Sequence, residues 1–405
     1  MAGPVPATGS AFITRLERPI STVIVPAKPD NGEPGGGPTH PGLRLAVKDA
    51  IDVAGVPTTA GSRVVADRAE PAPADADCLA GARTAGVTVV GKANLHELCF
   101  GASGVNPWFG TPVNPLDPHL IPGGSSSGSA VAVADGDADV AFGTDTAGSI
   151  RNPAACCGVV GLKTTWGRIP MGGVWPLAPS LDTVGPLART VDLLEQAMAL
   201  LEPGFARSAT GPGRVGRIRG LPADPAIDGA VDAALAATGW EVVPVELPGW
   251  AGAHAAAVTV LLGEALATHR GFVAEHLGGL GADVAARFEW ARTLPPTALG
   301  DARNIGHAWR AELAHAFARF DLLALPTMLG FPPRLVDEAP SPNSAAAAVN
   351  LAGHPALALP VPVPAGGALP ASLQLVGPDG SEELLVAAGL VVEAAAPAAP
   401  RRVPD

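Results

Sequence analysis

The sequence predicts an α/β protein in which helices are layered on a central sheet. Strand-like and helix-like segments alternate along much of the 405 residues, and such alternation favours a layered α/β arrangement over an all-α or all-β one. Hydrophobic residues make up 47% of the chain and charged residues only 16%. The chain can therefore bury a large core, as two or three domains or as one large domain. Its 50 glycines and 43 prolines predict that many loops join these elements.

The N-terminal half begins with an expected irregular arm over residues 1–40, which ends in the glycine- and proline-rich stretch NGEPGGGPTH. The first strand is expected in the short apolar run LRLAV at 43–47. The other segments expected in this half are a helix at 75–86, a strand at 87–91, a helix start at 94–98, a loop at 101–128, a helix start at 129–135 and a strand at 138–143.

In the C-terminal half, residues 190–202 have the apolar spacing of an amphipathic helix, and Thr190 is suited to cap its N-terminus. Residues 203–214 read as a loop, with a shift in composition that does not define a domain boundary. Beyond this loop we expect a helix at 226–239, a strand at 240–248, mostly helix at 250–320, a strand at 321–327, a helix at 343–353, strands at 356–364 and 371–378, and a last helix at 381–395.

Composition argues against several classes of protein. The formal charge is −12, with 26 basic and 38 acidic residues and no basic run, so a nucleic-acid-binding role is not expected. The four cysteines form no CxxC pair, so we expect no structural zinc site; they are Cys78, Cys99, Cys156 and Cys157. The adjacent pair Cys156–Cys157 reads as core packing.

We also expect no secretory signal and no membrane span. The N-terminus lacks a continuous apolar segment, and no uninterrupted apolar stretch reaches the ~18 residues that a spanning helix needs. The nearest candidate, residues 249–268, contains His254 and Glu264. A cytoplasmic protein is therefore expected.

Three short segments contain residues suited to catalysis: Ala46–Asp49 (AVKD), Gly123–Ser129 (GGSSSGS) and Gly143–Arg151 (GTDTAGSIR). Taken alone, a lysine is usually a solvated surface group, and a glycine–serine run is usually a flexible linker. The third segment is more specific, because an apolar strand runs there into a glycine-containing turn that presents a serine. Small residues in such a turn let the backbone approach a ligand and direct its N–H groups towards it.

Together the three segments can form a nucleophilic site. A serine hydroxyl needs a base to remove its proton, and none of the nine histidines lies in these segments. A lysine can be that base if burial lowers its pKa, because desolvation disfavours the ammonium form. A second serine can relay the proton, and consecutive backbone N–H groups of the turn can stabilise the oxyanion.

These segments resemble those of the amidase signature family, whose members use a Ser-Ser-Lys triad. By this resemblance Lys48 corresponds to the lysine of the family's VKD segment, and Ser149, in the sequence GSIR, corresponds to the nucleophile that accepts the acyl group. Ser125 corresponds to the bridging serine, which the family holds in a cis peptide with Ser126. It lies 24 residues before Ser149, the interval expected from the family pattern.

The resemblance also implies an oxyanion hole. The family's oxyanion hole uses backbone N–H groups just before and at the nucleophile, and these correspond to Thr146, Ala147, Gly148 and Ser149. Ala147 stands where the family often has a second glycine. No metal and no organic cofactor are implied.

The implied fold is a single large α/β/α layered domain over residues 41–405, with a central mixed, twisted β-sheet surrounded by helices. The similarity covers a core of about 41–200 and about 320–395. Residues 203–320 show no such similarity and are expected to form a variable, mostly helical insert.

Asp145 and Arg151, near the triad, have two interpretations. In the first, the two side chains form a buried ion pair that braces the loop. In the second, Arg151 binds a carboxylate or carbonyl group of the substrate. Asp182 and Thr183 are expected to brace the core. The residues expected to line a substrate pocket are Cys99, Phe100, Gly101, Ser126, Arg151, Met171, Trp175 and Leu177. Ser103 and Asn106 lie in a loop that, by the resemblance, passes near the site, and His96 and His354 have no assigned role.

A competing motif is G-x-S-x-G, which residues 124–128 satisfy and which would make Ser126 the nucleophile of an α/β-hydrolase. That motif needs a buried strand immediately before it, and the preceding PHLIPGG is not strand-like. Residues 158–165 superficially resemble a phosphate-binding loop but lack its Gly-Lys-Ser/Thr ending.

The sequence therefore predicts an amidase that hydrolyses the carboxamide C–N bond of a small molecule through an acyl-enzyme on Ser149. Two alternatives stay open: a glutaminase-type subunit of an amidotransferase complex, and an acyl-transfer or amide-forming enzyme with the same triad. The substrate is either aryl or alkyl, indole-like, or carboxylated or ureido. A homodimer would be an ordinary arrangement for such a protein, and no nucleic-acid or membrane partner is expected.

Overall fold

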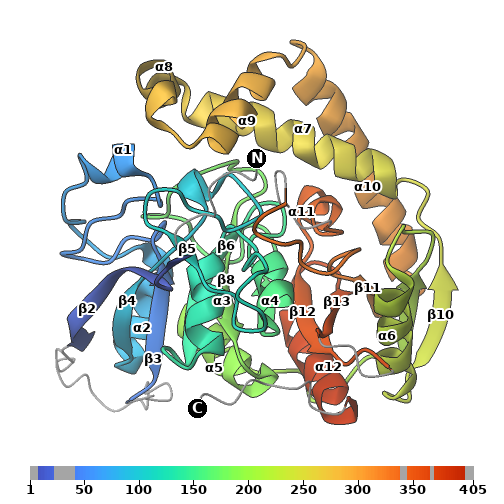
Figure 1. Cartoon of the computed structure of the whole chain (residues 1–405). Coiled ribbons are helices and arrows are strands. Elements are labelled where there is room, and N and C mark those ends of the chain that lie inside the picture. Colours follow the sequence, from blue (N-terminus) through green and yellow to red (C-terminus); the bar gives the residue numbers. More distant parts are fainter. Residues whose placement is uncertain (1–7, 22–41, 338–343, 365–368, 397–405) are drawn as a thin grey trace, which may run out of the picture.

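The computed structural model describes residues 8–21, 42–337, 344–364 and 369–396. In this part of the chain eleven strands form one sheet (Figure 1). In spatial order they are β10 (Glu241–Val245), β9 (Arg214–Ile218), β11 (Leu322–Pro326), β13 (Ala371–Val376), β12 (Ala356–Val361), β7 (Val160–Lys163), β8 (Thr183–Ala188), β6 (Val140–Asp145), β3 (Arg44–Lys48), β4 (Thr88–Ala93) and β2 (Phe12–Ser21). Parallel pairs such as β3–β6 and antiparallel pairs such as β6–β8 both occur, so the predicted mixed sheet is confirmed.

Helices surround this sheet, as the sequence predicts (Figure 1). The α-helices are α1 (Arg63–Ala66), α2 (Ala80–Ala85), α3 (Ser127–Ala134), α4 (Arg151–Cys157), α5 (Val191–Leu201), α6 (Pro225–Ala236), α7 (Trp250–Thr268), α8 (Arg270–His276), α9 (Ala282–Arg292), α10 (Ala298–Phe317), α11 (Ala347–Ala352) and α12 (Glu382–Ala395). Short 3₁₀ turns lie at Asp77–Leu79, Glu97–Cys99 and Leu277–Gly279. A separate parallel pair joins β1 (Thr8–Gly9) to β5 (Thr111–Pro112).

The expected irregular arm is wrong for part of its length. Residues 12–21 form β2, which pairs antiparallel with β4 and covers an edge of the sheet. The pairing with β2 gives hydrogen-bond partners to backbone groups of β4 that would otherwise be exposed at the edge of the sheet. Phe12 is buried, and its aromatic ring anchors the start of β2. Thr8–Gly9 of the expected arm form β1, and residues 1–7 and 22–40 lie outside the described residues.

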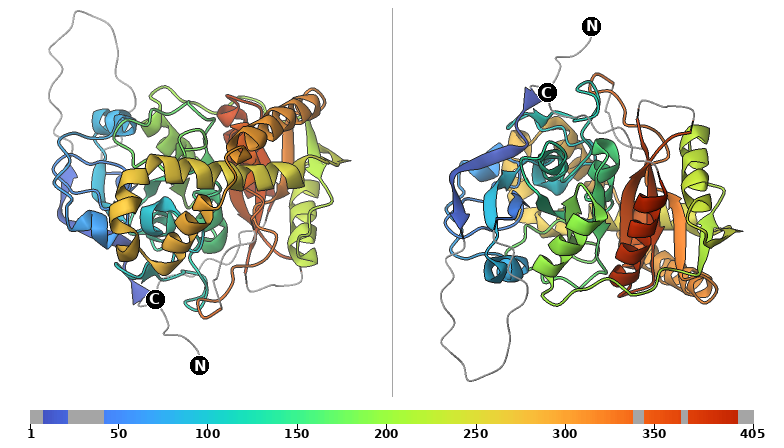
Figure 2. Two further views of the ribbon diagram at one scale, coloured as in Figure 1. Left: turned by 90° about the horizontal axis from the view of Figure 1, so that it is seen from above. Right: turned by 90° about the horizontal axis from the view of Figure 1, so that it is seen from below.

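The expected helical insert over 203–320 contains two parts. Strands β9 and β10 pair in parallel and α6 connects them, so this unit extends the main sheet beyond β11. The part that follows is mostly helical, and its helices α7 to α10 lie together across one edge of the molecule (Figures 1 and 2). The insert is therefore partly a continuation of the sheet.

Helix α7 has the length and composition of a membrane-spanning helix, with a mean hydropathy of 1.3 over its most apolar window. In the structure 39% of that window is buried, and the helix packs against α9, α10 and α11. Its carboxylate Glu264 accepts hydrogen bonds from the backbone N–H (3.0 Å) and hydroxyl (2.8 Å) of Ser180. Helix α7 thus fastens the helical part to the sheet-bearing part.

The two adjacent cysteines lie in the core, as the sequence predicts. Cys156 and Cys157 are buried free thiols in α4, and Cys156 Sγ lies 3.6 Å from Met328 Sδ. Strand β8, by contrast, was not expected, because its segment TVGPLA is short and contains glycine and proline. All six of its residues are buried between neighbouring strands.

The N-cap of α5 is the predicted one, since the Thr190 hydroxyl accepts a hydrogen bond from Leu193 N at 3.3 Å. We expect Thr190→Ala to lower the free energy of unfolding by about 1 kcal/mol, because a backbone N–H loses its acceptor. Urea unfolding measures this change. Thr190→Ser keeps the hydroxyl and should retain most of the stability, so equal losses in the two variants would contradict the capping role.

Candidate active site

The three triad candidates come from different elements that meet at one edge of the sheet. Lys48 is the last residue of β3, and the neighbouring parallel strand β6 ends at Asp145, just before the turn that carries Ser149. Carboxyl ends of parallel strands lie at the same edge of a sheet. Ser125 lies just before α3, and Ser126 N donates to Ser149 O at 3.1 Å, which joins the second segment to the third.

Lys48 is fully buried and its amine is hydrogen-bonded to two hydroxyl groups. The Nζ atom lies 2.7 Å from Ser125 Oγ and 2.7 Å from Thr144 Oγ1. Burial lowers the pKa of Lys48 below 10.5, and the partly opposing influences of Cys99, Asp145 and Asp182 do not reverse this shift. A neutral amine is the form that can accept a proton.

The serine segment differs in one detail from the resemblance. The cis peptide bond joins Gly124 to Ser125, whereas the resemblance implied one between Ser125 and Ser126. Ser126 is fully buried and its hydroxyl donates to Thr144 O at 3.2 Å. This contact does not support a substrate-binding role for Ser126, because its hydroxyl donates to a backbone carbonyl of the protein.

Ser149 is 8% exposed, so a small ligand can reach it. Within the described residues its hydroxyl has no hydrogen-bond partner, and Ser125 Oγ is bonded to Lys48 instead. Catalytic hydrogen bonds often shorten only when substrate is bound. The arrangement thus brings Ser125 and Lys48 together directly and places Ser149 beside them.

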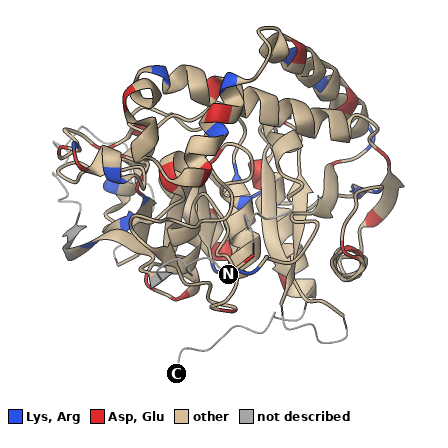
Figure 3. Ribbon diagram, turned by 45° about the horizontal axis from the view of Figure 1, so that its top comes forward, with Lys and Arg blue, Asp and Glu red and all other residues tan. Residues whose placement is uncertain are grey.

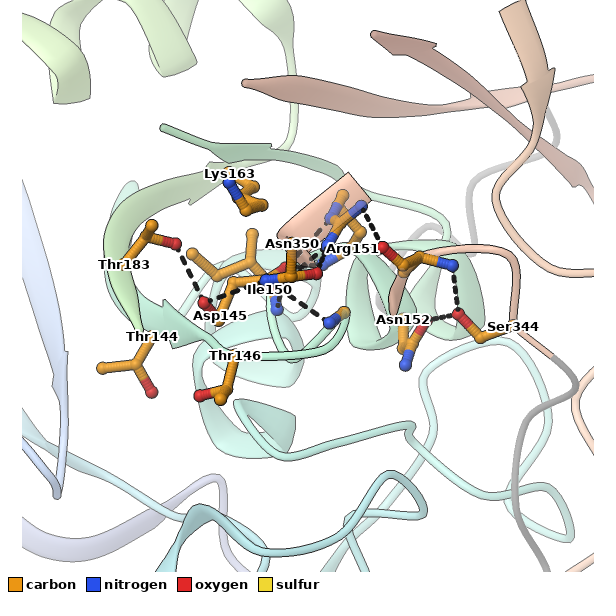
Figure 4. Close-up of polar contacts among 12 residues, drawn as sticks. Thr144, Asp145, Thr146, Ile150, Arg151, Asn152, Lys163, Thr183, Ser344 and Asn350 are labelled. Carbon is orange, nitrogen blue, oxygen red and sulfur yellow. Dashed lines mark hydrogen bonds and ion pairs between the residues drawn. The ribbon is translucent and has the colours of Figure 1, made fainter. Parts of the chain in front are cut away.

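The turn that carries Ser149 is held by the buried carboxylate of Asp145 (Figure 4). This carboxylate accepts from Gly148 N (2.8 Å), Ile150 N (3.1 Å), Asn350 Nδ2 (2.8 Å) and Arg151 Nε (3.0 Å). Burial alone would raise the pKa of Asp145, but the charge and hydrogen bonds of Arg151 outweigh it and hold the pKa well below its usual value. Asp145 is therefore an anion that fixes the turn.

Arg151 braces this turn. It is fully buried, and all five of its N–H donors are occupied. Their acceptors are Asp145 (twice), Ala346 O, Gln374 Oε1 and Asn350 Oδ1. These contacts agree with the interpretation of Arg151 as a buried brace, and they do not support its predicted substrate-binding role, because no donor remains for a ligand.

The backbone around Ser149 changes the predicted oxyanion hole. Gly148 N–H donates to Asp145, so Gly148 is removed from the predicted donors. In the described part of the chain, the N–H groups of Thr146, Ala147 and Ser149 donate to no protein acceptor. Gly148 has φ +117°, and a Cβ there would lie 2.7 Å from Ala346 Cβ, so the turn requires glycine at this position.

Two neighbours brace the site as predicted. Asp182 accepts from Thr146 Oγ1 (2.7 Å) and Leu177 N (2.9 Å), and Thr183 Oγ1 donates to Asp145 O at 2.9 Å. Burial raises the pKa of Asp182, although these hydrogen bonds oppose the shift. Asp182 and Thr183 thus join the turn that carries Ser149 to strand β8 and the segment before it.

The expected pocket residues fall into different places. Phe100 is buried edge-on against Phe288 of α9, with ring centroids 5.0 Å apart. A Cβ on Gly101 would lie 2.0 Å from His96 Nε2, so Gly101 provides room for that ring. These two contacts do not support substrate-binding roles for Phe100 and Gly101, since both residues pack against protein.

The remaining residues predicted to line the pocket lie in different surroundings. Cys99 is buried beside the lysine, with its Sγ accepting from Thr144 Oγ1 at 3.9 Å. Met171 packs against the main core, and Leu177 is buried. Trp175 lines a cavity of about 690 Å³.

Several functional contacts were missed from the sequence. Thr144, one residue before the end of β6, contacts the lysine, and only its strand position next to Asp145 could have suggested this. Asn350 and Gln374 bond Arg151 from about 200 residues away along the chain, and no local pattern signals such pairs. His96 lies 2.8 Å from Asp283, which connects the loop before Cys99 to α9.

Neither the distribution of charged side chains nor the grouping of potential metal ligands indicates a second binding site among the described residues. Lys and Arg are scattered among Asp and Glu over the described elements (Figure 3). Among the described residues, no group of three or more His, Cys, Asp or Glu side chains is placed to hold a metal ion.

Comparison with known proteins agrees with this geometry. Residues 33–386 match the sequence model of the family described as Amidase. The chain belongs to this amidase family. The matched range includes 203–320, which the resemblance noted from the motifs did not cover. Members of the amidase family hydrolyse C–N bonds, and the chain is an enzyme of this class.

Three relatives illustrate the range of the amidase family. A glutamyl-tRNA(Gln) amidotransferase subunit of Halobacterium salinarum is 35% identical over 87% of this chain and 95% of its own length. The 2-amino-5-chloromuconic acid deaminase of Comamonas testosteroni is 38% identical over 87% of this chain and 81% of its own length. A solved chain from a vestigial complex, described as revealing the origins of an s-triazine catabolic enzyme, has a TM-score of 0.81 and 30% identity, covering 89% and 85% of the two chains.

The Asp145–Arg151 pair gives a stability prediction. We expect Asp145→Asn to lower the free energy of unfolding by about 3–5 kcal/mol, because it leaves a buried guanidinium without its counter-charge. Chemical denaturation followed by circular dichroism measures this. The matched control is Glu241→Gln, which breaks a pair with Arg214 whose side chains are 41% (Arg214) and 62% (Glu241) exposed and should cost at most about 1 kcal/mol. Similar losses in both variants would contradict the bracing role of Asp145.

Proposed function

We propose that this protein is a free-standing amidase that hydrolyses a small-molecule carboxamide through an acyl-enzyme on Ser149. Ser149 Oγ attacks the carbonyl carbon, and its proton passes through Ser125 to neutral Lys48. The tetrahedral intermediate collapses as the C–N bond breaks, and the leaving amine takes a proton back along the same path. Water then attacks the acyl-enzyme by the reverse relay and releases the carboxylic acid.

The observation that carries this proposal is the contact of 2.7 Å between Lys48 Nζ and Ser125 Oγ, both of which belong to fully buried residues. Burial disfavours the ammonium form of this lysine and lowers its pKa, which makes its neutral form available as a base. The N–H groups of Thr146, Ala147 and Ser149 lie in the nucleophile turn and are suited to stabilise the oxyanion.

The first test removes each triad residue in turn. We expect Ser149→Ala to abolish turnover, and Lys48→Ala to lower kcat/KM by about 10²–10⁴-fold, because the general base is lost. Ser125→Ala should also lower kcat/KM severely. Release of ammonia from an amide series measures these effects, and circular dichroism checks folding.

A matched control is Ser129→Ala. Within the described residues the hydroxyl of this buried serine in α3 donates only to Phe142 O, at 3.3 Å, and it lies outside the relay. This variant should keep nearly full activity. Full activity in Lys48→Ala, with the protein folded, would overturn the mechanism.

The pH dependence provides a second test. Since the pKa of Lys48 is lowered by burial, the neutral form increases as pH rises towards that pKa. We therefore expect kcat/KM to rise about tenfold per pH unit below this pKa and to level above it. A rate that falls steadily from about pH 6 to 9, in a protein that stays folded, would exclude a neutral-lysine base.

A second candidate function is work inside an amidotransferase complex, because the relative from Halobacterium salinarum is named for such a role and aligns over 87% of this chain. A free amidase should hydrolyse simple amides by itself, whereas a component of a complex should be nearly silent without its partner. Purified protein assayed with glutamine and with aliphatic, aromatic and carboxylated amides separates the two, with Ser149→Ala as the blank. Activity on glutamine only, and only after partner proteins are added, would favour the amidotransferase role.

A further inference from the structure

The amine of Lys48 has more polar neighbours than the proposed relay uses. Besides its contact with Ser125, Lys48 Nζ lies 2.7 Å from Thr144 Oγ1, and Thr144 Oγ1 lies 3.9 Å from Cys99 Sγ. In the described part of the chain these two contacts are the only side-chain hydrogen bonds of the Thr144 hydroxyl. Cys99 and Thr144, both buried, therefore extend the line of polar side chains beyond Lys48.

The orientation of the amine decides whether Lys48 can act as a base. A neutral amine has two N–H donors and one lone pair, and the lone pair must face the Ser125 hydroxyl to take its proton. The second contact of 2.7 Å must then run from an N–H of Lys48 to Thr144 Oγ1. A Thr144 hydroxyl that donated to Lys48 instead would occupy the lone pair and block the transfer.

Cys99 is placed to select the productive arrangement. Its Sγ atom accepts from the Thr144 hydroxyl, so the hydroxyl proton points away from Lys48. Burial raises the pKa of the Cys99 thiol, although the charge of Lys48 and the hydrogen bond from Thr144 oppose the shift. The thiol is therefore uncharged at neutral pH and places no counter-ion beside the amine.

The backbone holds Cys99 in this place in an unfavourable conformation. Among the described residues other than glycine, only Ala60, Leu98 and Cys99 have a positive φ, of +49°, +54° and +60°. Leu98 N donates to Ala60 O at 2.7 Å, and Cys99 N donates to His96 O at 3.0 Å, so hydrogen bonds fix this segment. Strained residues of this kind persist only where their surroundings hold them, and they cluster at functional sites.

The charged groups around Lys48 do not provide the same order. Asp145 and Asp182 both favour its charged form, but within the described residues neither carboxylate is hydrogen-bonded to its amine. Asp145 accepts from Arg151, and Asp182 accepts from Thr146. The direction of the lone pair is therefore left to the uncharged side chains.

We propose that Cys99 and Thr144 are positioning residues for amide hydrolysis, because their hydrogen bond turns the lone pair of Lys48 towards Ser125. The inference rests on the proposed amidase function and adds two residues that act through the lysine without touching substrate. Loss of either residue should therefore lower kcat and leave KM nearly unchanged.

The test is the pH profile of kcat/KM in Cys99→Ala. Without the sulfur, the Thr144 hydroxyl is free to donate to the neutral amine, which should lower kcat about 3–10-fold, as for one hydrogen bond. The same donation stabilises the neutral form of Lys48, so the rise of kcat/KM should move to lower pH. The conservative variant Cys99→Ser provides a hydroxyl acceptor and should restore kcat to within about twofold of wild type.

The matched control is Cys78→Ala, because Cys78 is also a buried free thiol but lies in the main hydrophobic core. It should keep the wild-type kcat and pH profile. Thr144→Val removes the hydroxyl and leaves an N–H of Lys48 without its acceptor. This variant should lower kcat about tenfold and keep KM within about twofold of wild type.

An unchanged kcat in Cys99→Ala or in Thr144→Val would overturn the proposal while leaving the amidase function intact. A shift of the Cys99→Ala profile to higher pH would also overturn it, because water at the amine moves the profile in that direction. If wild-type protein turns over no amide, the proposed function fails, and NMR titration of the Lys48 side chain tests the order alone. A lower pKa of Lys48 in Cys99→Ala than in wild type would then support the order, and an equal or higher pKa would refute it.

Discussion

The buried contact between Asp145 and Arg151 is the interaction on which the rest of the site depends. One carboxylate fixes the N–H groups of Gly148 and Ile150, and one guanidinium connects this carboxylate to Gln374 and to the residue before α11. Buried charges are tolerated only when their donors and acceptors are satisfied. Because this brace uses Gly148 N–H internally, the shape of the turn and the direction of its remaining N–H groups are set before any substrate binds.

The hydrogen-bond partners of Lys48 also explain why its pKa is lowered. Adjacent parallel strands bring Lys48 and Thr144 to one edge of the sheet, and two hydroxyl groups, rather than a carboxylate, receive the amine at 2.7 Å. A carboxylate partner would raise the pKa of the lysine, whereas neutral partners leave burial as the dominant influence. In the proposed mechanism this environment makes Lys48 suitable as the base, because the hydrogen-bond partners of the buried amine are uncharged.

Sequence reasoning predicted most strands and helices and Thr190 as a cap, because these rest on local patterns. The contact between Lys48 and Ser125 was expected from the family resemblance. Sequence reasoning failed where a contact depends on the tertiary fold. Whether Arg151 braces or binds could be decided only by its partners about 200 residues away. Gly148 was misassigned because the direction of a single N–H group is not encoded in spacing, and β2 was missed because its partner strand, not its composition, makes it a strand.

The most direct test of the neutral-lysine base is an NMR titration of the lysine side chains. The protein has only four lysines, Lys28, Lys48, Lys92 and Lys163, so the Lys48 signal can be assigned as the one missing from a Lys48→Met variant. Lys163 is distinguishable because burial lowers its pKa to about 7. The account predicts that the pKa of Lys48 lies below the ordinary value of 10.5. A pKa of Lys48 at or above 10.5 would contradict it.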